Sequence, residues 1–174
     1  MLYLLWIDHV IQAPETRRAF IYWTEEYKNL VLNTVEEYKK TLDNIIITKN
    51  IQIIWEEFNN YNNDPESYFI TWEVCKQYNI KHLFCDPSEE EQNQMWITRE
   101  WTDEDDNFDK QYEKNHTLRE KYWLEKIMSY KSKNIIFVCG NKHISTFKEK
   151  LENNSRKIEI INNKFCEELL NYKF

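Results

Sequence analysis

The segment NIIFVCGNKH, residues 134–143, decides how this chain folds. Its first part, Asn134 to Cys139, contains a continuous apolar run from Ile135 onward, which is typical of a strand buried on both faces. Gly140 follows the run, and a helical pattern that includes Phe147 and Leu151 comes next. A buried strand that passes through a short turn into a helix is the unit from which parallel α/β sheets are built.

The same alternation of apolar runs and helical patterns extends through the whole chain. Further strands are expected at Leu2–Ile7, Ile51–Trp55, Ile80–Cys85 and Lys157–Ile161. Helical patterns separate them, from after Pro14 to Tyr38, from Pro65 to Tyr78, from Asp109 to Tyr130 and from Phe165 to Leu170. Residues 45–47 fit either the end of the first helix or a separate strand. This order predicts an α/β fold, with a mostly parallel sheet of about five strands flanked by helices, in a single domain over residues 1–174.

Composition narrows the class of partner. The chain has 23 Lys and Arg residues against 30 Asp and Glu, for a formal net charge of −7. Nucleic-acid-binding domains present a basic face, so no nucleic-acid partner is expected. No apolar segment approaches the length of a membrane span, and the apolar start ends at Asp8, too early for a signal peptide. The four cysteines are widely spaced, as for free thiols. We therefore expect a cytoplasmic protein without a membrane partner; the pattern does not indicate an oligomeric state.

Polar residues follow four of the expected strands. They are Asp8 and His9 after the first, Glu56 and Glu57 after the second, Asp86 after the third, and residues 140–143 after the fourth. Ligands of parallel α/β sheets bind outside the carboxyl ends of the strands, so these side chains are expected at one edge. A mixture of imidazole and carboxylate suits a divalent ion such as Zn, Mn or Fe. The alternative is that strands simply end at the surface, where polar residues are common.

This set suggests roles for particular residues. His9 and His143 are the expected metal ligands, and Glu56 or Glu57 would complete the ion's surroundings. A bound ion would lower the pKa of a water molecule and make it a nucleophile. The second carboxylate, or Asp8, would act as general base.

A substrate-binding role is expected for Arg119, Tyr122 and Gly140. Arg119 and Tyr122 lie three residues apart on one helical face and could hold an anionic group. The alternative is a surface ion pair and a core ring. Gly140 permits a tight turn into a helix whose free N–H groups could face an anion. His116 is a candidate near the start of its helix, whereas His82, inside a strand, is expected to pack rather than to bind a ligand.

These segments resemble one known superfamily. The segment VCGNKH at 138–143, the segment REKYW at 119–123, the strand end at Asp8-His9 and the segment IIWEE at 53–57 are similar to TraB and Tiki proteins, erythromycin esterase-like enzymes and ChaN-like haem-binding lipoproteins. Members place two GxxH-type motifs and acidic residues at strand ends of an α/β fold. Trp6 stands where the second motif has Gly140. The resemblance implies a small bacterial protein, with metal-dependent hydrolase or protease activity, or haem binding through His9 or His143. Haem is disfavoured, because the pattern shows no wide glycine-lined pocket.

Two functions remain in competition. The first is a metal-dependent hydrolase acting on a small-molecule or peptide substrate at the strand carboxyl ends. The second is a non-catalytic binding or interaction module on the same fold, in which the many Trp and Tyr side chains would anchor an interface.

Overall fold

The computed structural model describes residues 1–12, 22–58, 69–97, 108–130, 133–161 and 166–172. Its strands are β1 (Leu2–Ile7), β2 (Ile53–Glu56), β3 (Lys81–Phe84), β4 (Ile135–Gly140) and β5 (Ile158–Ile161). They form one sheet in the order β3-β2-β4-β1-β5, and every neighbouring pair is parallel. The predicted α/β fold with five parallel strands is therefore confirmed.

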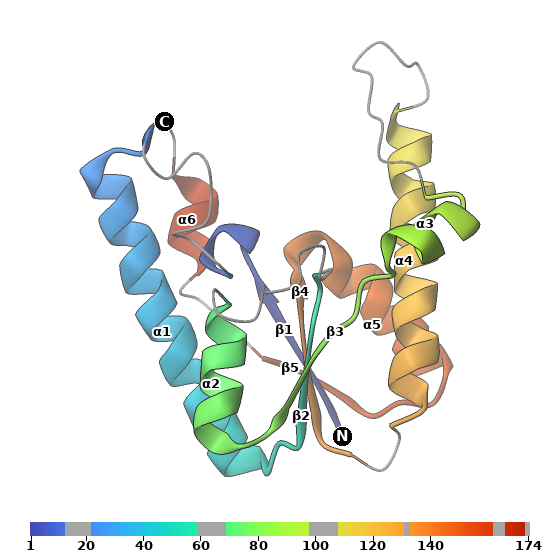
Figure 1. The fold of residues 1–174 in the computed structure, drawn as a ribbon, viewed down its shortest axis with the longest axis horizontal. Helices are drawn as coiled ribbons and strands as arrows, with labels where there is room; N and C mark the ends of the chain where they lie inside the picture. The colour runs from blue at the N-terminus through green and yellow to red at the C-terminus, as the bar shows by residue number, and fades with distance from the viewer. Residues whose placement is uncertain (13–21, 59–68, 98–107, 131–132, 162–165, 173–174) are drawn as a thin grey trace.

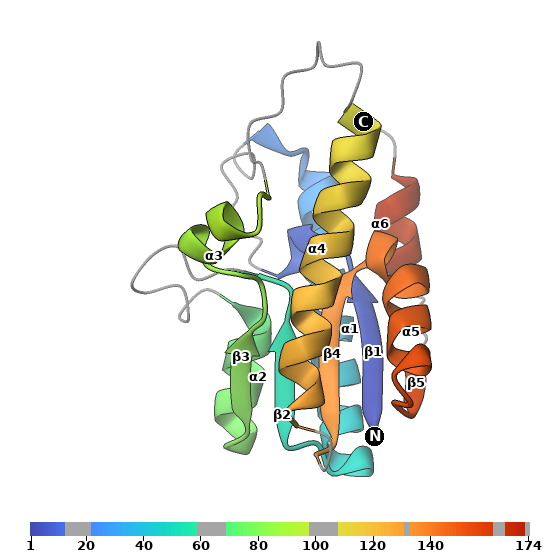
Figure 2. The same cartoon turned by 90° about the vertical axis from the view of Figure 1, so that its right-hand side faces the viewer.

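Helices cover both faces of this sheet (Figure 1). One face carries α1 (Glu25–Lys49), α2 (Ile70–Tyr78) and α6 (Glu167–Asn171). The other carries α4 (Phe108–Met128) and α5 (Ile144–Asn153), and Figure 2 shows α4 crossing in front of β2 and β4. Three short elements complete the fold: α3 (Glu89–Gln94), η1 (His9–Ile11) and η5 (Asn141–His143). No helix in the described segments is long and apolar enough to cross a bilayer.

The buried strands contribute side chains to two separate hydrophobic cores, because successive side chains of a strand point to opposite faces of the sheet. In β4, Ile136 and Val138 pack with α1 and α2, whereas Ile135, Phe137 and Cys139 pack with α4 and α5. All six residues of β4 are buried, which explains why the sequence shows a continuous apolar run there. The same alternation governs the polar residues at the strand ends.

The structure decides one open point about the helices and adds one helix. Residues 45–47 belong to α1, which extends to Lys49 and ends at Asn50 in the left-handed region, with a φ of 49°. Helix α3 was not expected; its start is fixed by Ser88 and Glu91, whose side chains each bond the backbone N–H of the other. The expected helix starts near Pro14, Pro65 and Phe165 lie outside the described residues.

The connections place a crevice between β1 and β4. These strands are neighbours, but α1 follows β1 on one face and α5 follows β4 on the other. When the connections that follow two adjacent parallel strands turn to opposite faces of the sheet, a crevice forms at the carboxyl ends of those strands. Ligands bind in this crevice in such folds. The loops that carry His9 and His143 lie at this point.

Candidate active site

A cavity of about 300 Å³ lies at the carboxyl ends of β1, β2 and β4. Its lining includes residues that the sequence singled out, namely Asp8, His9, Glu57, His116, Arg119 and the turn at 140–143. Tyr112 also lines it. The topology therefore brings both histidine loops and Glu57, which directly follows β2, to the same cavity.

Glu56 and Glu57 are adjacent in sequence but face opposite layers. Glu56 is fully buried and its carboxylate contacts Thr71 of α2, whereas Glu57 contacts Arg119 of α4. The alternation of a strand forces this separation. Only Glu57 lines the cavity, so the two carboxylates cannot both act on a ligand there.

Glu57 is the centre of the contacts around the cavity. Its Oε1 lies 2.6 Å from Arg119 Nη2, 3.4 Å from His143 Nε2 and 3.7 Å from His9 Nε2. Its Oε2 accepts a 2.7 Å hydrogen bond from the backbone N–H of Gly140. Burial by itself would raise the pKa of Glu57, but the hydrogen bond to His143 and the charges of Arg119, His143 and His9 outweigh it and lower the pKa to about 2. Glu57 is therefore ionised at neutral pH.

His143 is held between two carboxylates. Its Nδ1 lies 2.8 Å from Glu120 Oε1, and only 2% of the residue is exposed. Burial opposes the charged ring, yet hydrogen bonds to Glu120 and Glu57 raise the pKa of His143. Glu120 is in turn bound by Thr146 and Lys150, at 2.6 and 2.7 Å. Nδ1 therefore donates to Glu120, and Nε2 faces Glu57.

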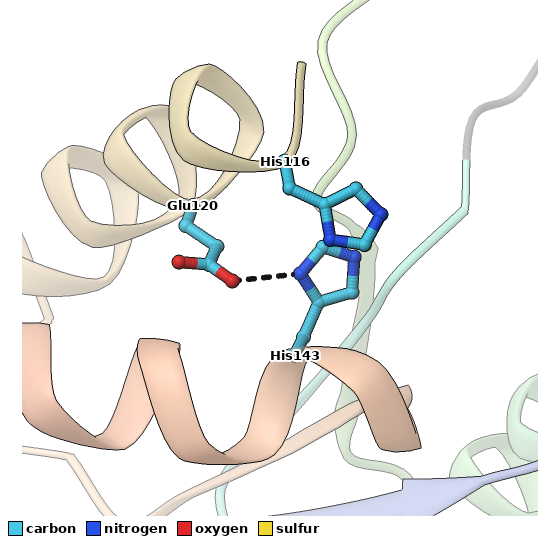
Figure 3. Close-up of side chains that lie close together, drawn as sticks. All are labelled: His116, Glu120 and His143. Atoms are coloured by element: carbon cyan, nitrogen blue, oxygen red, sulfur yellow. Dashed lines mark hydrogen bonds and ion pairs between the residues drawn. The ribbon is translucent and has the colours of Figure 1, made fainter. Parts of the chain in front are cut away.

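The ring of His116 stacks on that of His143, with ring centroids 4.1 Å apart and an angle of 20° between the planes (Figure 3). Burial, together with the charges of His143 and Arg119, lowers the pKa of His116 to about 4. His116 is therefore neutral at neutral pH, and its ring covers that of His143, whose pKa is raised. His116 lies inside α4 rather than near its start.

His9 reaches the cavity from η1. Its Nδ1 lies 2.7 Å from Gln12 Oε1, and the side chain is 46% exposed. Asp8, just before it, caps η1 by accepting a 2.9 Å hydrogen bond from the backbone N–H of Val10. Gln12 thus orients the His9 ring from its Nδ1 side.

Arg119 is committed to two carboxylates. Besides Glu57, it binds Asp86 through Nε and Nη2, at distances from 2.7 to 3.1 Å. Trp123 Nε1 donates a further 3.0 Å hydrogen bond to Asp86, and the guanidinium lies over the Trp123 ring. Burial raises the pKa of Asp86, and Arg119 opposes that effect. Arg119 thus holds Glu57 and Asp86 in place, and these two carboxylates neutralise part of the positive charge that a ligand would meet.

Tyr122, a predicted substrate-binding residue, and His82, which was expected to pack, lie elsewhere. The Tyr122 hydroxyl donates to Glu91 Oε1 at 2.8 Å, and Tyr122 does not line the cavity. The His82 side chain is 5% exposed and its Nε2 lies 2.8 Å from Glu56 Oε2, as expected for a packed histidine. Both side chains serve contacts away from the cavity.

Gly140 is required for space rather than for an unusual backbone. Its φ of −64° and ψ of 150° are open to any residue. A Cβ atom at this position, however, would lie 2.8 Å from His9 Nε2. The sequence suggested a tight turn as the reason for the only glycine, whereas the structure shows that it admits the His9 ring.

Gly140→Ala is therefore expected to displace the His9 ring while leaving the fold intact. His9 is half-exposed and can swing outward, so the free energy of unfolding should change by less than about 1 kcal/mol. Proton NMR should show that nuclear Overhauser contacts between the His9 ring and residue 140 are lost. Asn141→Ala, one exposed position further, should retain them. Retention of the wild-type ring position in Gly140→Ala would contradict this explanation.

One compact set of metal-ligating atoms exists among the residues described. Atoms of His116, Glu120 and His143 lie within 4.8 Å of one another and could hold a metal ion (Figure 3). His9 does not belong to this set. His116 and Glu120 were not among the expected ligands; their spacing of four on α4, which puts them on one helical face, was the available signal.

No family model matches the chain, and no curated protein or solved structure is significantly similar to it. The resemblance to the TraB, Tiki, erythromycin esterase-like and ChaN-like superfamily therefore stays a prediction.

Proposed function

We propose that this protein is a metal-dependent hydrolase whose ion is held by His9 Nε2, His143 Nε2 and Glu57. One observation carries the proposal. Both imidazoles turn Nε2 towards the same oxygen, Glu57 Oε1, at 3.7 and 3.4 Å. Each Nδ1 is held by a neighbour, Gln12 or Glu120, at 2.7 and 2.8 Å. Metal-binding histidines characteristically have their second nitrogen fixed in this way.

The donor set fits a divalent ion. Two imidazoles and a carboxylate suit Zn, Mn or Fe. An imidazole binds a metal ion through a deprotonated nitrogen, so the affinity of His143 Nε2 for the ion should rise with pH. The three atoms are not all within 4.8 Å of one another, so the half-exposed His9 side chain has to adjust. Oε2 of Glu57 remains fixed by Gly140, and Arg119 retains Asp86 as its partner.

The bound ion would supply a water of lowered pKa as nucleophile. Asp8 lines the cavity beside His9 and is the candidate general base. Lys142 and Arg119 place positive charge on the cavity wall, which favours an anionic substrate. A volume of about 300 Å³ lies at the small end of ligand pockets and favours a small molecule over a peptide.

The compact set formed by His116, Glu120 and His143 is the second candidate for the ion. The short distances between its ligand atoms favour this set, but two features oppose it. Glu120 already accepts hydrogen bonds from Thr146 and the cationic Lys150. The two rings are stacked at 20°, so their in-plane lone pairs run in nearly parallel planes and do not converge. We therefore favour the set that contains His9.

Metal binding by histidine variants separates the candidates. Protein stripped with EDTA is titrated with Zn²⁺ and, separately, Mn²⁺ by calorimetry, and thermal unfolding verifies the fold of each variant. If the proposal is correct, one ion binds the wild type, His9→Ala and His143→Ala lose it, and His116→Ala retains it. Loss in His116→Ala with retention in His9→Ala would assign the ion to the second set.

A wild type that binds no ion would overturn the hydrolase proposal and favour the binding module. For metal-loaded protein, the matching assay is hydrolysis of small phosphate and carboxylate esters. His9→Ala should then lose activity together with the ion, whereas Tyr122→Phe, which alters a side chain outside the cavity, should retain both.

A further inference from the structure

A second buried carboxylate, that of Glu56, is linked to His9 through the side chain of Gln12. Its Oε1 accepts hydrogen bonds from Gln12 Nε2 at 3.0 Å and from Thr71 Oγ1 at 2.9 Å. Its Oε2 lies 2.8 Å from His82 Nε2. Both Glu56 and Gln12 are fully buried. Glu56 is therefore fixed on several sides and does not face the cavity.

The hydrogen bonds of Gln12 define its orientation. Its amide nitrogen donates to Glu56 Oε1 and, at 3.4 Å, to the backbone carbonyl of Glu57. Its amide oxygen therefore faces His9 Nδ1, 2.7 Å away. An amide oxygen can only accept, so the hydrogen of this bond belongs to His9 Nδ1.

The opposite orientation of the amide is costly. Rotating it by 180° would set the Gln12 oxygen against Glu56 Oε1, two acceptors at about the 3.0 Å of the present hydrogen bond. A buried polar group that loses its hydrogen-bond partner destabilises the fold. Thr71 reinforces Glu56 as acceptor, and its own hydroxyl lies 2.7 Å from the Tyr38 hydroxyl.

We infer that Gln12 and Glu56 are positioning residues that hold neutral His9 as the Nδ1–H tautomer, so that Nε2 presents its lone pair to the cavity. Free histidine in water prefers the other tautomer, with the hydrogen on Nε2, so this arrangement reverses an intrinsic preference. The use of the lone pair as a metal ligand rests on the proposed function. The tautomer itself is a property of the metal-free protein.

The tautomer can be measured directly. Long-range nitrogen–proton NMR spectra of ¹⁵N-histidine-labelled, metal-free protein, at a pH where the His9 ring is neutral, distinguish the two forms. The wild type should show Nδ1–H at His9. Gln12→Met removes the acceptor but keeps an unbranched side chain, and should shift His9 towards Nε2–H.

Gln92→Met is the matched control, because Gln92 is also buried but bonds the carbonyl of Pro87, away from the cavity. It should leave the His9 spectrum unchanged. A wild-type His9 in the Nε2–H form would overturn the inference even if no Gln12 variant folds. An unchanged Nδ1–H tautomer in Gln12→Met would also overturn it.

Zinc binding then separates this inference from the proposed function. Gln12→Met should weaken Zn²⁺ binding by about 10–100-fold, the usual effect of removing a partner of a metal-binding histidine. The expected tautomer shift in a protein whose wild type binds no metal would support the positioning role and refute the hydrolase. Metal binding through His9 in the wild type, without a tautomer shift in Gln12→Met, would support the proposed function and refute the positioning role.

Discussion

Arg119→Leu is expected to lower the free energy of unfolding by about 3–5 kcal/mol, because it leaves two buried carboxylates without their cation. Glu57 is 2% exposed and Asp86 11% exposed, and Arg119 contacts both at 2.6 and 2.7 Å. Leucine retains the helical preference and much of the apolar stem, so the loss reports chiefly on charge. Urea denaturation at neutral pH measures it.

Lys126→Leu is the matched control on the same helix. Lys126 is 47% exposed and lies 3.9 Å from Glu91, so its loss should cost less than about 1 kcal/mol. Adding Asp86→Asn to Arg119→Leu should recover part of the lost stability, because one unpaired charge is removed with the cation. A loss below about 1 kcal/mol in Arg119→Leu would show that the two carboxylates find other compensation.

Acid is expected to destabilise the metal-free protein through Glu57 in particular. Its folded-state pKa of about 2 lies below the ordinary value of 4.5. A carboxyl group whose pKa is lowered by folding contributes stability above its unfolded pKa and loses it as pH falls through the folded value. The contribution, about 3 kcal/mol from the size of this shift, should be complete above pH 5 and should decline between about pH 4.5 and 2.

Glu57→Gln should flatten this part of the stability profile, measured by urea denaturation from pH 7 to pH 2 in EDTA. Glu25→Gln, which changes an exposed carboxylate on α1, should leave the slope unchanged. Asp86 acts in the opposite direction, since its raised pKa favours the folded state at low pH, so the comparison between variants is the informative quantity. Equal slopes in Glu57→Gln and the wild type would contradict the lowered pKa.

The fold could be predicted from the sequence because it depends on local apolar patterns. Residues 134–139 read as a buried strand, and the structure buries all of β4. The topology rule then placed His9, Glu57 and His143 at one edge. The roles of Gln12 and Glu120 were missed, because they depend on which side chains distant elements bring together. Helix α4 supplies Arg119, His116 and Glu120 to strand ends that are far away in sequence.

The two histidine loops also differ in a way that spacing does not reveal. The sequence aligns Trp6 with Gly140, each three residues before a histidine. The sheet pairs Gly140 with Ile7 instead, so His9 follows its strand one residue sooner than His143 does. Because of this offset, the His9 ring lies next to Gly140, whereas the His143 ring contacts Glu120 of α4.

The division of Glu56 and Glu57 between the two faces has a consequence for cooperativity. Each carboxylate ties a different helical layer to the end of β2, one through Thr71 and the other through Arg119. If one helical layer opened alone, the carboxylate that contacts it would lose its partner while it remained in a poorly solvated interior. The layers should therefore exchange their amide hydrogens in one concerted event rather than as separate units, with the carboxyl end of β2 among the last segments to open.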